Sequence, residues 1–239
     1  MSDRRADEAN WTVWTALSAA YDAFRDNYIP LVATTLIWLL PAIGLDVLGV
    51  NRGVVIAVEV LIGSFLLISL APGAAESLLD HPVRLSDCLM HSLQCLRPGA
   101  LGLAFLQAAG VVVGLALLIV PGLYLISVWS VASAAFIPEG RRPLAAFRRS
   151  LWLTRGRLLR IVLTAILFIV LVALLSAGFR VLLSAIPGFG ATYGRLVIWL
   201  VDASFIALTA CLTTVIYCLL RFDKEGTTLE LVTASMHPD

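Results

Sequence analysis

Long apolar stretches dominate the chain, and polar residues are confined to the shorter segments between them. Each stretch is close to the about 20 residues that a helix needs to cross a bilayer. The pattern predicts an all-α polytopic membrane protein with six transmembrane helices, at residues 29–49, 53–76, 99–120, 122–138, 158–183 and 196–220.

Three amphipathic segments end in an arginine and run directly into an apolar stretch. The elbow arginines are Arg25, Arg97 and Arg155. Counted back from each arginine, positions −8 and −4 are large and apolar and position −5 is small, and these offsets share one helical face. The aligned residues are Leu17, Leu89 and Phe147 at −8, Tyr21, Leu93 and Leu151 at −4, and Ala20, Ser92 and Ser150 at −5.

This periodicity predicts three repeats, each an interfacial amphipathic helix followed by two spans. We expect one membrane domain over residues 11–221, with repeats at about 11–80, 81–138 and 139–221. A polar N-terminal tail (1–10) and a polar C-terminal tail (222–239) flank this domain.

The uncharged run from Gly99 to Pro138 is predicted to fold back on itself. As a single helix its 40 residues would extend about 60 Å, twice the roughly 30 Å hydrocarbon core. Pro121-Gly122 near its middle favours a tight hairpin, because proline removes a backbone donor and glycine permits a turn. Pro72-Gly73 is expected to open the second span near its cytoplasmic end.

Composition and charge support this topology. The chain is 60% hydrophobic and 14% charged, with a mean hydropathy of +0.94, too apolar for a water-soluble core. With six spans, 14 of the 17 basic residues fall on one side of the membrane. The positive-inside rule then places both termini in the cytoplasm.

The four cysteines form two pairs, Cys88 with Cys95 and Cys211 with Cys218. Seven residues span roughly 10.5 Å along a helix, too far for a disulfide. His91 shares a face with the first pair, so a metal site is conceivable. The cysteines align with alanine or leucine in the other repeats, which favours a packing role, and we expect no metal and no cofactor.

The third amphipathic segment is the most basic part of the chain. Its arginines, with aromatic residues on or beside the apolar stripe, predict a helix in the headgroup layer that contacts anionic lipid. The plainer alternative is that they only set topology and anchor the helix at the interface. The candidate lipid-contact residues are Arg141, Arg142, Arg148, Arg149, Arg155, Arg157 and Arg160.

The stretch from Glu139 to Arg157, with Ala-Phe-Arg-Arg-Ser-Leu-Trp-Leu-Thr-Arg-Gly-Arg at its centre, resembles a known family. It is similar to the membrane domain of bacterial glycerophosphodiester phosphodiesterases and to the related YciC-like six-helix proteins, over about Trp11 to Arg221. The resemblance implies a bacterial inner-membrane protein. The catalytic domain of the fused members has no counterpart in this sequence, and no catalytic motif is visible, so we expect no enzymatic activity.

Three charges inside the predicted spans are the best functional lead: Glu59, Arg180 and Asp202. An unpaired charge near the bilayer centre costs at least about 2.5–3.5 kcal/mol, so partners are expected. Arg180 and Asp202 lie at similar distances from the turn between the last two spans, which would bring them to one depth. Glu59 could join them, or pair with Arg52 seven residues earlier.

Two functions follow from these features. The first is a non-enzymatic role in the membrane, through contact with anionic lipid or assembly with a protein partner; nothing indicates nucleic acid. The second is a small-molecule or lipid transporter built around the intramembrane charges, although a triplication without an inverted pair is not a common transporter design. Gly110 and Gly114 predict a close helix contact, preferably inside the bundle.

Overall fold

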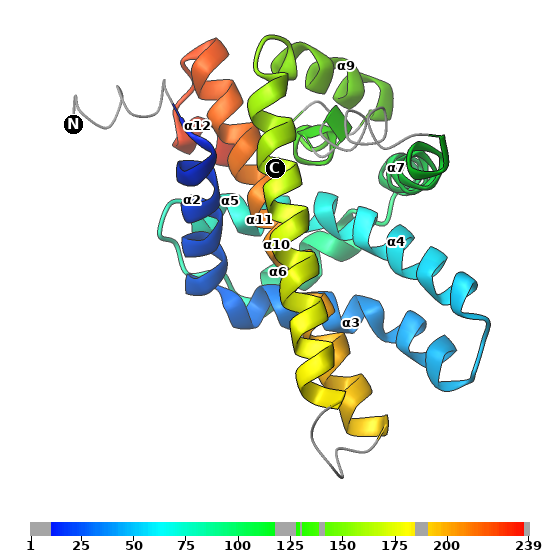
Figure 1. The fold of residues 1–239 in the computed structure, drawn as a ribbon. Helices are drawn as coiled ribbons and strands as arrows, with labels where there is room; N and C mark the ends of the chain where they lie inside the picture. Colours follow the sequence, from blue (N-terminus) through cyan, green and yellow to red (C-terminus); the bar gives the residue numbers. More distant parts are fainter. Residues whose placement is uncertain (1–10, 118–127, 130, 139–141, 185–190, 237–239) are drawn as a thin grey trace.

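The computed structural model describes residues 11–117, 128–129, 131–138, 142–184 and 191–236, and these residues fold as helices with no strand among them (Figure 1). The all-α prediction is confirmed for them. The helices, in chain order, are α2 (Val13–Asp26), α3 (Tyr28–Val47), α4 (Arg52–Ser69), α5 (Ala71–Ser77), α6 (Leu85–Gln94), α7 (Pro98–Leu117), α9 (Pro143–Thr154), α10 (Leu158–Ser184), α11 (Ala191–Glu225) and α12 (Leu229–Met236).

Four helices of the described part are long and apolar enough to cross a membrane: α3, α4, α10 and α11. They coincide with the first, second, fifth and sixth predicted spans. Among the four, α10 buries the smallest share of its residues and α11 the largest. Because a water-soluble protein does not leave so much apolar helix surface uncovered, these helices mark the chain as a membrane protein.

The second predicted span is interrupted where the sequence places Pro72. Helix α4 ends at Ser69 and a separate short helix, α5, begins at Ala71 with Pro72 in its first turn. This position suits proline because the first amides of a helix have no intrahelical acceptor. The expected break near Pro72-Gly73 is therefore confirmed.

Helix α7 forms the first part of the long uncharged run, and the predicted hairpin at Pro121-Gly122 lies outside the described residues. Beyond it, Val128, Trp129 and residues 131–135 are helical. Gln107 of α7 donates a hydrogen bond to the Trp129 carbonyl at 2.7 Å. A Cβ added to Gly110 would lie 1.3 Å from the Trp129 ring. The Gly110 face thus packs inside the chain, while the surroundings of Gly114 are not among the described side chains.

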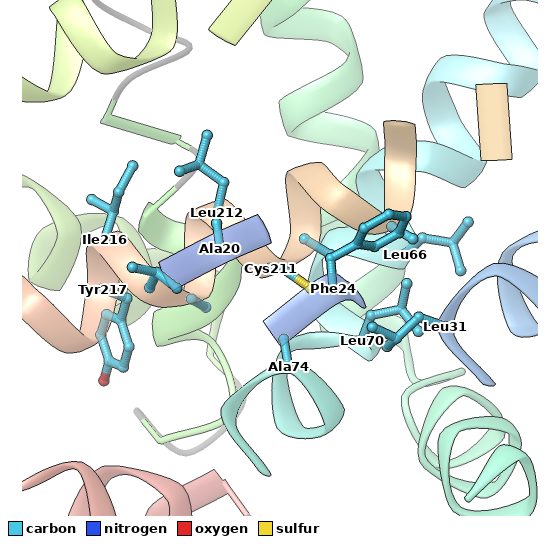
Figure 2. Close-up of a cluster of buried hydrophobic side chains, with 14 of the residues drawn as sticks. Ala20, Phe24, Leu31, Leu66, Leu70, Ala74, Cys211, Leu212, Ile216 and Tyr217 are labelled. Atoms are coloured by element: carbon cyan, nitrogen blue, oxygen red, sulfur yellow. The ribbon is translucent and has the colours of Figure 1, made fainter. Parts of the chain in front are cut away.

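Helix α11 runs through the centre of the bundle and contacts α2, α3, α4 and α5. Its inner surface carries small residues that let neighbouring backbones approach closely. Larger side chains from the other helices fill the space beside it, including Phe24, Leu31, Leu66 and Leu70 (Figure 2). The buried alanine and cysteine residues of α11 are Ala203, Ala207, Ala210, Cys211 and Cys218.

The three amphipathic segments form helices α2, α6 and α9, and they bury the same positions. Counted back from each elbow arginine, positions −9, −5 and −2 are buried, whereas position −4 is about half exposed. The buried positions thus carry mostly small side chains, whereas the large apolar side chain at position −4 faces outward, an arrangement suited to a helix that meets lipid. The buried residues are Ala16, Ala20 and Ala23 in α2, Cys88, Ser92 and Cys95 in α6 and its C-cap, and Ala146, Ser150 and Leu153 in α9.

The segment after Arg221, treated above as a polar tail, is folded up to Met236. Helix α11 continues to Glu225, and α12 packs against α5. Val232, Thr233 and Met236 of α12 are buried. The tail assignment is thus wrong for this segment, because its few apolar residues recur at helical spacing and bury against the domain rather than in a core of their own.

Candidate functional site

Arg180 and Asp202, on the neighbouring helices α10 and α11, form an ion pair. The Arg180 Nη2 atom lies 3.5 Å from Asp202 Oδ2, as the depth argument predicts. Their side chains remain 49% and 34% exposed. The pair therefore sits on the flank of the helix hairpin rather than in the buried core.

Glu59 takes the other predicted partner, Arg52 of its own helix. The Arg52 Nη1 atom lies 3.8 Å from Glu59 and 3.2 Å from Asp46, so one guanidinium bridges two carboxylates at the α3–α4 turn. The predicted intramembrane cluster thus divides into two sets of direct ion pairs, and the two sets remain within electrostatic range of each other, because Asp202 and Arg180 act on Glu59 and Arg52 acts on Asp202. Paired charges of this kind can fix the register of packed helices.

The richest polar network joins α9 to the end of α11. Arg157 makes a bidentate pair with Asp223, with Nε and Nη2 donating at 3.0 and 2.8 Å. Arg149 pairs with Glu225. Lys224 donates to the carbonyls of Trp152 and Arg155. We call Arg149, Arg157, Asp223, Lys224 and Glu225 the elbow clasp.

Aromatic contacts and one glycine shape the clasp. Arg149 and Lys224 both lie over the Trp152 ring, at 5.0 and 4.9 Å from its centroid. Cations are attracted to the face of an indole ring, which adds to the ion pairs. Gly156 turns the chain between α9 and α10 with a φ of +91°, a conformation that L side chains rarely adopt.

The clasp divides the candidate lipid-contact arginines into two sets. Arg149 and Arg157 are engaged with α11, and Arg160 donates to the Trp11 carbonyl at 3.3 Å. Arg141 lies outside the described residues. Exposed side chains remain at Arg142, Arg148 and Arg155, and the other two elbow arginines, Arg25 and Arg97, are exposed as well.

Sequence reasoning missed the acidic partners in the clasp, Asp223 and Glu225. They lie 66 and 76 residues from the arginines that they bind, beyond the reach of any local pattern. The six-span topology contained a signal, because it placed the end of the last span on the same side as the basic segment. Opposite charges on one side of a membrane protein are candidates for pairing.

A surface hollow of about 490 Å³ lies beside the clasp at the junction of α9 and α10. Its lining combines an aromatic ring, a guanidinium-bearing residue and a bare glycine backbone. Such a combination suits an anionic group attached to an apolar body. The lining residues are Leu151, Trp152, Thr154, Arg155, Gly156 and Leu158.

The conceivable metal site at Cys88, His91 and Cys95 finds no support in the geometry. Within the described ranges, no three His, Cys, Asp or Glu side chains come together in a way that could hold a metal ion. Burial raises the pKa of the Cys88 thiol to about 12. Cys88 is therefore a protonated packing residue at neutral pH. Its Sγ lies 3.2 Å from the position that a Cβ added to Gly73 would occupy, so it packs closely against α5.

Comparisons with protein-family models, with curated proteins and with solved structures find no significant match to this chain.

Proposed function

We propose that the protein is a six-span bacterial inner-membrane protein of three repeats, and that its third elbow binds anionic phospholipid. In this proposal α7 and the helix around Trp129 are the third and fourth spans. The hydrogen bond from Gln107 to the Trp129 carbonyl and the packing of the Trp129 ring against Gly110 support a hairpin between these two spans. The three elbows and both termini then lie on the cytoplasmic side, in keeping with the distribution of basic residues.

The helix contacts support the three repeats through their cyclic order. Helix α6 of the second repeat packs on α3 of the first, α9 of the third on α7 of the second, and α2 of the first on α10 of the third. Each interfacial helix thus lies on the first long helix of the preceding repeat. The second long helices pack the other way round the cycle in two places, on the first long helix of the following repeat: α4 against α7 and α11 against α3.

Elbow contacts within repeats give a second line of support. Asn27 and Arg157 occupy the same position, two residues after their elbow arginines. Asn27 bonds to Ser77, at the end of the second helix of its repeat. Arg157 bonds to Asp223, at the corresponding end of the third repeat. Two repeats therefore close their interfacial corner with different residues in the same place.

The single observation that carries the lipid function is the hollow that Arg155 lines, on a basic helix that also exposes Arg142 and Arg148. The acidic residues of the clasp, Asp223 and Glu225, already pair with Arg157 and Arg149. The exposed side chains of Arg142, Arg148 and Arg155 are therefore not needed for these ion pairs. Each basic residue near an anionic membrane surface contributes about 1 kcal/mol of attraction. The hollow supplies a place for one headgroup at Arg155.

Transport through the intramembrane charges is the alternative. The residues Glu59, Arg180 and Asp202 do not line the elbow hollow, and each has an ion-pair partner. A transport site usually keeps charged groups facing a water-filled cavity. The pairing therefore favours a non-enzymatic role in lipid contact.

The test replaces Arg148 and Arg155 with glutamine and measures the phospholipid that stays bound through purification. We expect the double variant to lose about 2 kcal/mol of attraction, or roughly 30-fold in affinity, for phosphatidylglycerol. Binding of phosphatidylcholine should not change. Arg84→Gln, an exposed arginine at the start of α6, is the matched control. Equal retention of phosphatidylglycerol by all three proteins would overturn the lipid function.

A further inference from the structure

An apolar groove of about 330 Å³ runs between α10 and α11, and its wall on α10 spans Ile161 to Ala173. Twelve residues of helix extend about 18 Å, close to the roughly 15 Å of hydrocarbon in one leaflet. The volume falls in the ordinary range of ligand pockets, about 300–1,000 Å³. The groove therefore has the length and the volume for one acyl chain.

The groove is apolar although two of its lining residues, Thr209 and Thr213, carry hydroxyl groups. The hydroxyl of Thr209 donates to the Phe205 carbonyl, and that of Thr213 donates to the Ala210 carbonyl. Both threonines thus satisfy their hydroxyls within α11. The wall of the groove on α11 is completed by Leu212 and Ile216, which project from the side of the helix away from Tyr217 (Figure 2).

The groove and the elbow hollow lie along one face of α10. Leu158 lines the hollow, and Ile161 and Ala165 line the groove. Residues three and seven positions apart share a helical face. The end of the groove nearest the start of α10 therefore lies within about one helical turn of Leu158 and so of the hollow, which Arg155 also lines.

We infer that the groove and the hollow form one site for a single anionic phospholipid, with the phosphate at Arg155 and one acyl chain between α10 and α11. An anionic phospholipid carries a charged headgroup and an apolar chain in one molecule, and this matches a groove that is apolar along its length and has an exposed arginine in the hollow near one end. The inference rests on the lipid function proposed above and adds that the chain, as well as the headgroup, is recognised.

The test fills the groove without touching the arginines. Ala165→Phe places a ring between α10 and α11, and Ala177→Phe makes the same change at an exposed position of α10 outside the groove. Native mass spectrometry would compare binding of dioleoyl and dihexanoyl phosphatidylglycerol, which share a headgroup. Displacing about two methylenes predicts a roughly tenfold fall in the dioleoyl preference of Ala165→Phe, and no change for Ala177→Phe.

The outcomes separate the two proposals. If Ala165→Phe keeps the dioleoyl preference while Arg148→Gln/Arg155→Gln loses phosphatidylglycerol, the chain site is overturned and the headgroup function stands. If neither change matters, both fail. Ala173→Phe, at the far end of the groove, is the second variant should Ala165→Phe not fold, and it is expected to reduce the same preference.

Discussion

Replacing Asn27 with alanine is expected to destabilise the protein more than any exposed polar substitution. Asn27 is buried where α2 meets α3. Its Nδ2 donates to Ser77 Oγ at 2.8 Å, and its Oδ1 accepts from the buried Val83 amide at 2.8 Å. Alanine leaves that amide without an acceptor and removes a bond to Ser77, which should cost about 3 kcal/mol.

The measurement is thermal unfolding of purified Asn27→Ala in detergent. A loss of that size should lower the Tm by about 6–12 °C in a domain of this length. Asn51→Ala is the control, because Asn51 accepts only from the exposed Gly53 amide at the start of α4 and its loss should cost about 1 kcal/mol. Equal shifts for the two variants would show that the Asn27 contacts do not hold the elbow.

Replacing Asp223 with alanine should produce the second largest loss. The side chains of Asp223 and Arg157 are only 13% and 28% exposed, so removing the carboxylate leaves a partly buried guanidinium without its bidentate partner. Fully buried pairs cost about 3–5 kcal/mol to break and exposed pairs about 0–1. An intermediate loss of about 2 kcal/mol, or about 4–8 °C in Tm, is expected.

A double-mutant cycle with Arg157→Ala isolates the pair. We expect Asp223→Ala and Arg157→Ala to be less than additive by about 1–2 kcal/mol, because each single change already removes the interaction. Glu230→Ala, an exposed acid on α12, should leave the Tm within about 1–2 °C of the wild-type value. Strict additivity of the two clasp variants would contradict a structural role for the clasp.

The sequence predicted the elements well because a bilayer imposes simple rules on length and polarity. Helices α3, α4 and α10 begin within one residue of the predicted starts and α11 begins five residues before its predicted start, and the break at Pro72 follows from its missing amide. The Arg180–Asp202 pair was predictable because two helices joined by a turn place residues at equal distances from that turn side by side. Local pattern was sufficient for each of these features.

Long-range partners were not predictable from pattern. Arginine beside an apolar helix has the same appearance whether it meets a phosphate or a carboxylate, so Arg149 and Arg157 were grouped with the lipid-contact residues although they bind α11. Helix α12 was overlooked because its apolar residues are few, and only the packed domain shows that α5 covers them. The apolar groove between α10 and α11 could not be predicted either, because the sequence does not show which faces of the two helices meet.

Cysteine accessibility in sealed membranes tests the proposal that the three elbows lie on one side of a six-span membrane protein. Cysteines introduced one at a time at Arg84, Arg142 and Asn51 would report on the segments before α6, before α9 and between α3 and α4, because the four native cysteines are buried. The account predicts that a membrane-impermeant maleimide labels Asn51→Cys in intact cells, and labels Arg84→Cys and Arg142→Cys only after permeabilisation. Labelling of Arg84→Cys and Arg142→Cys from opposite sides would mean an odd number of crossings between them, and would contradict the account.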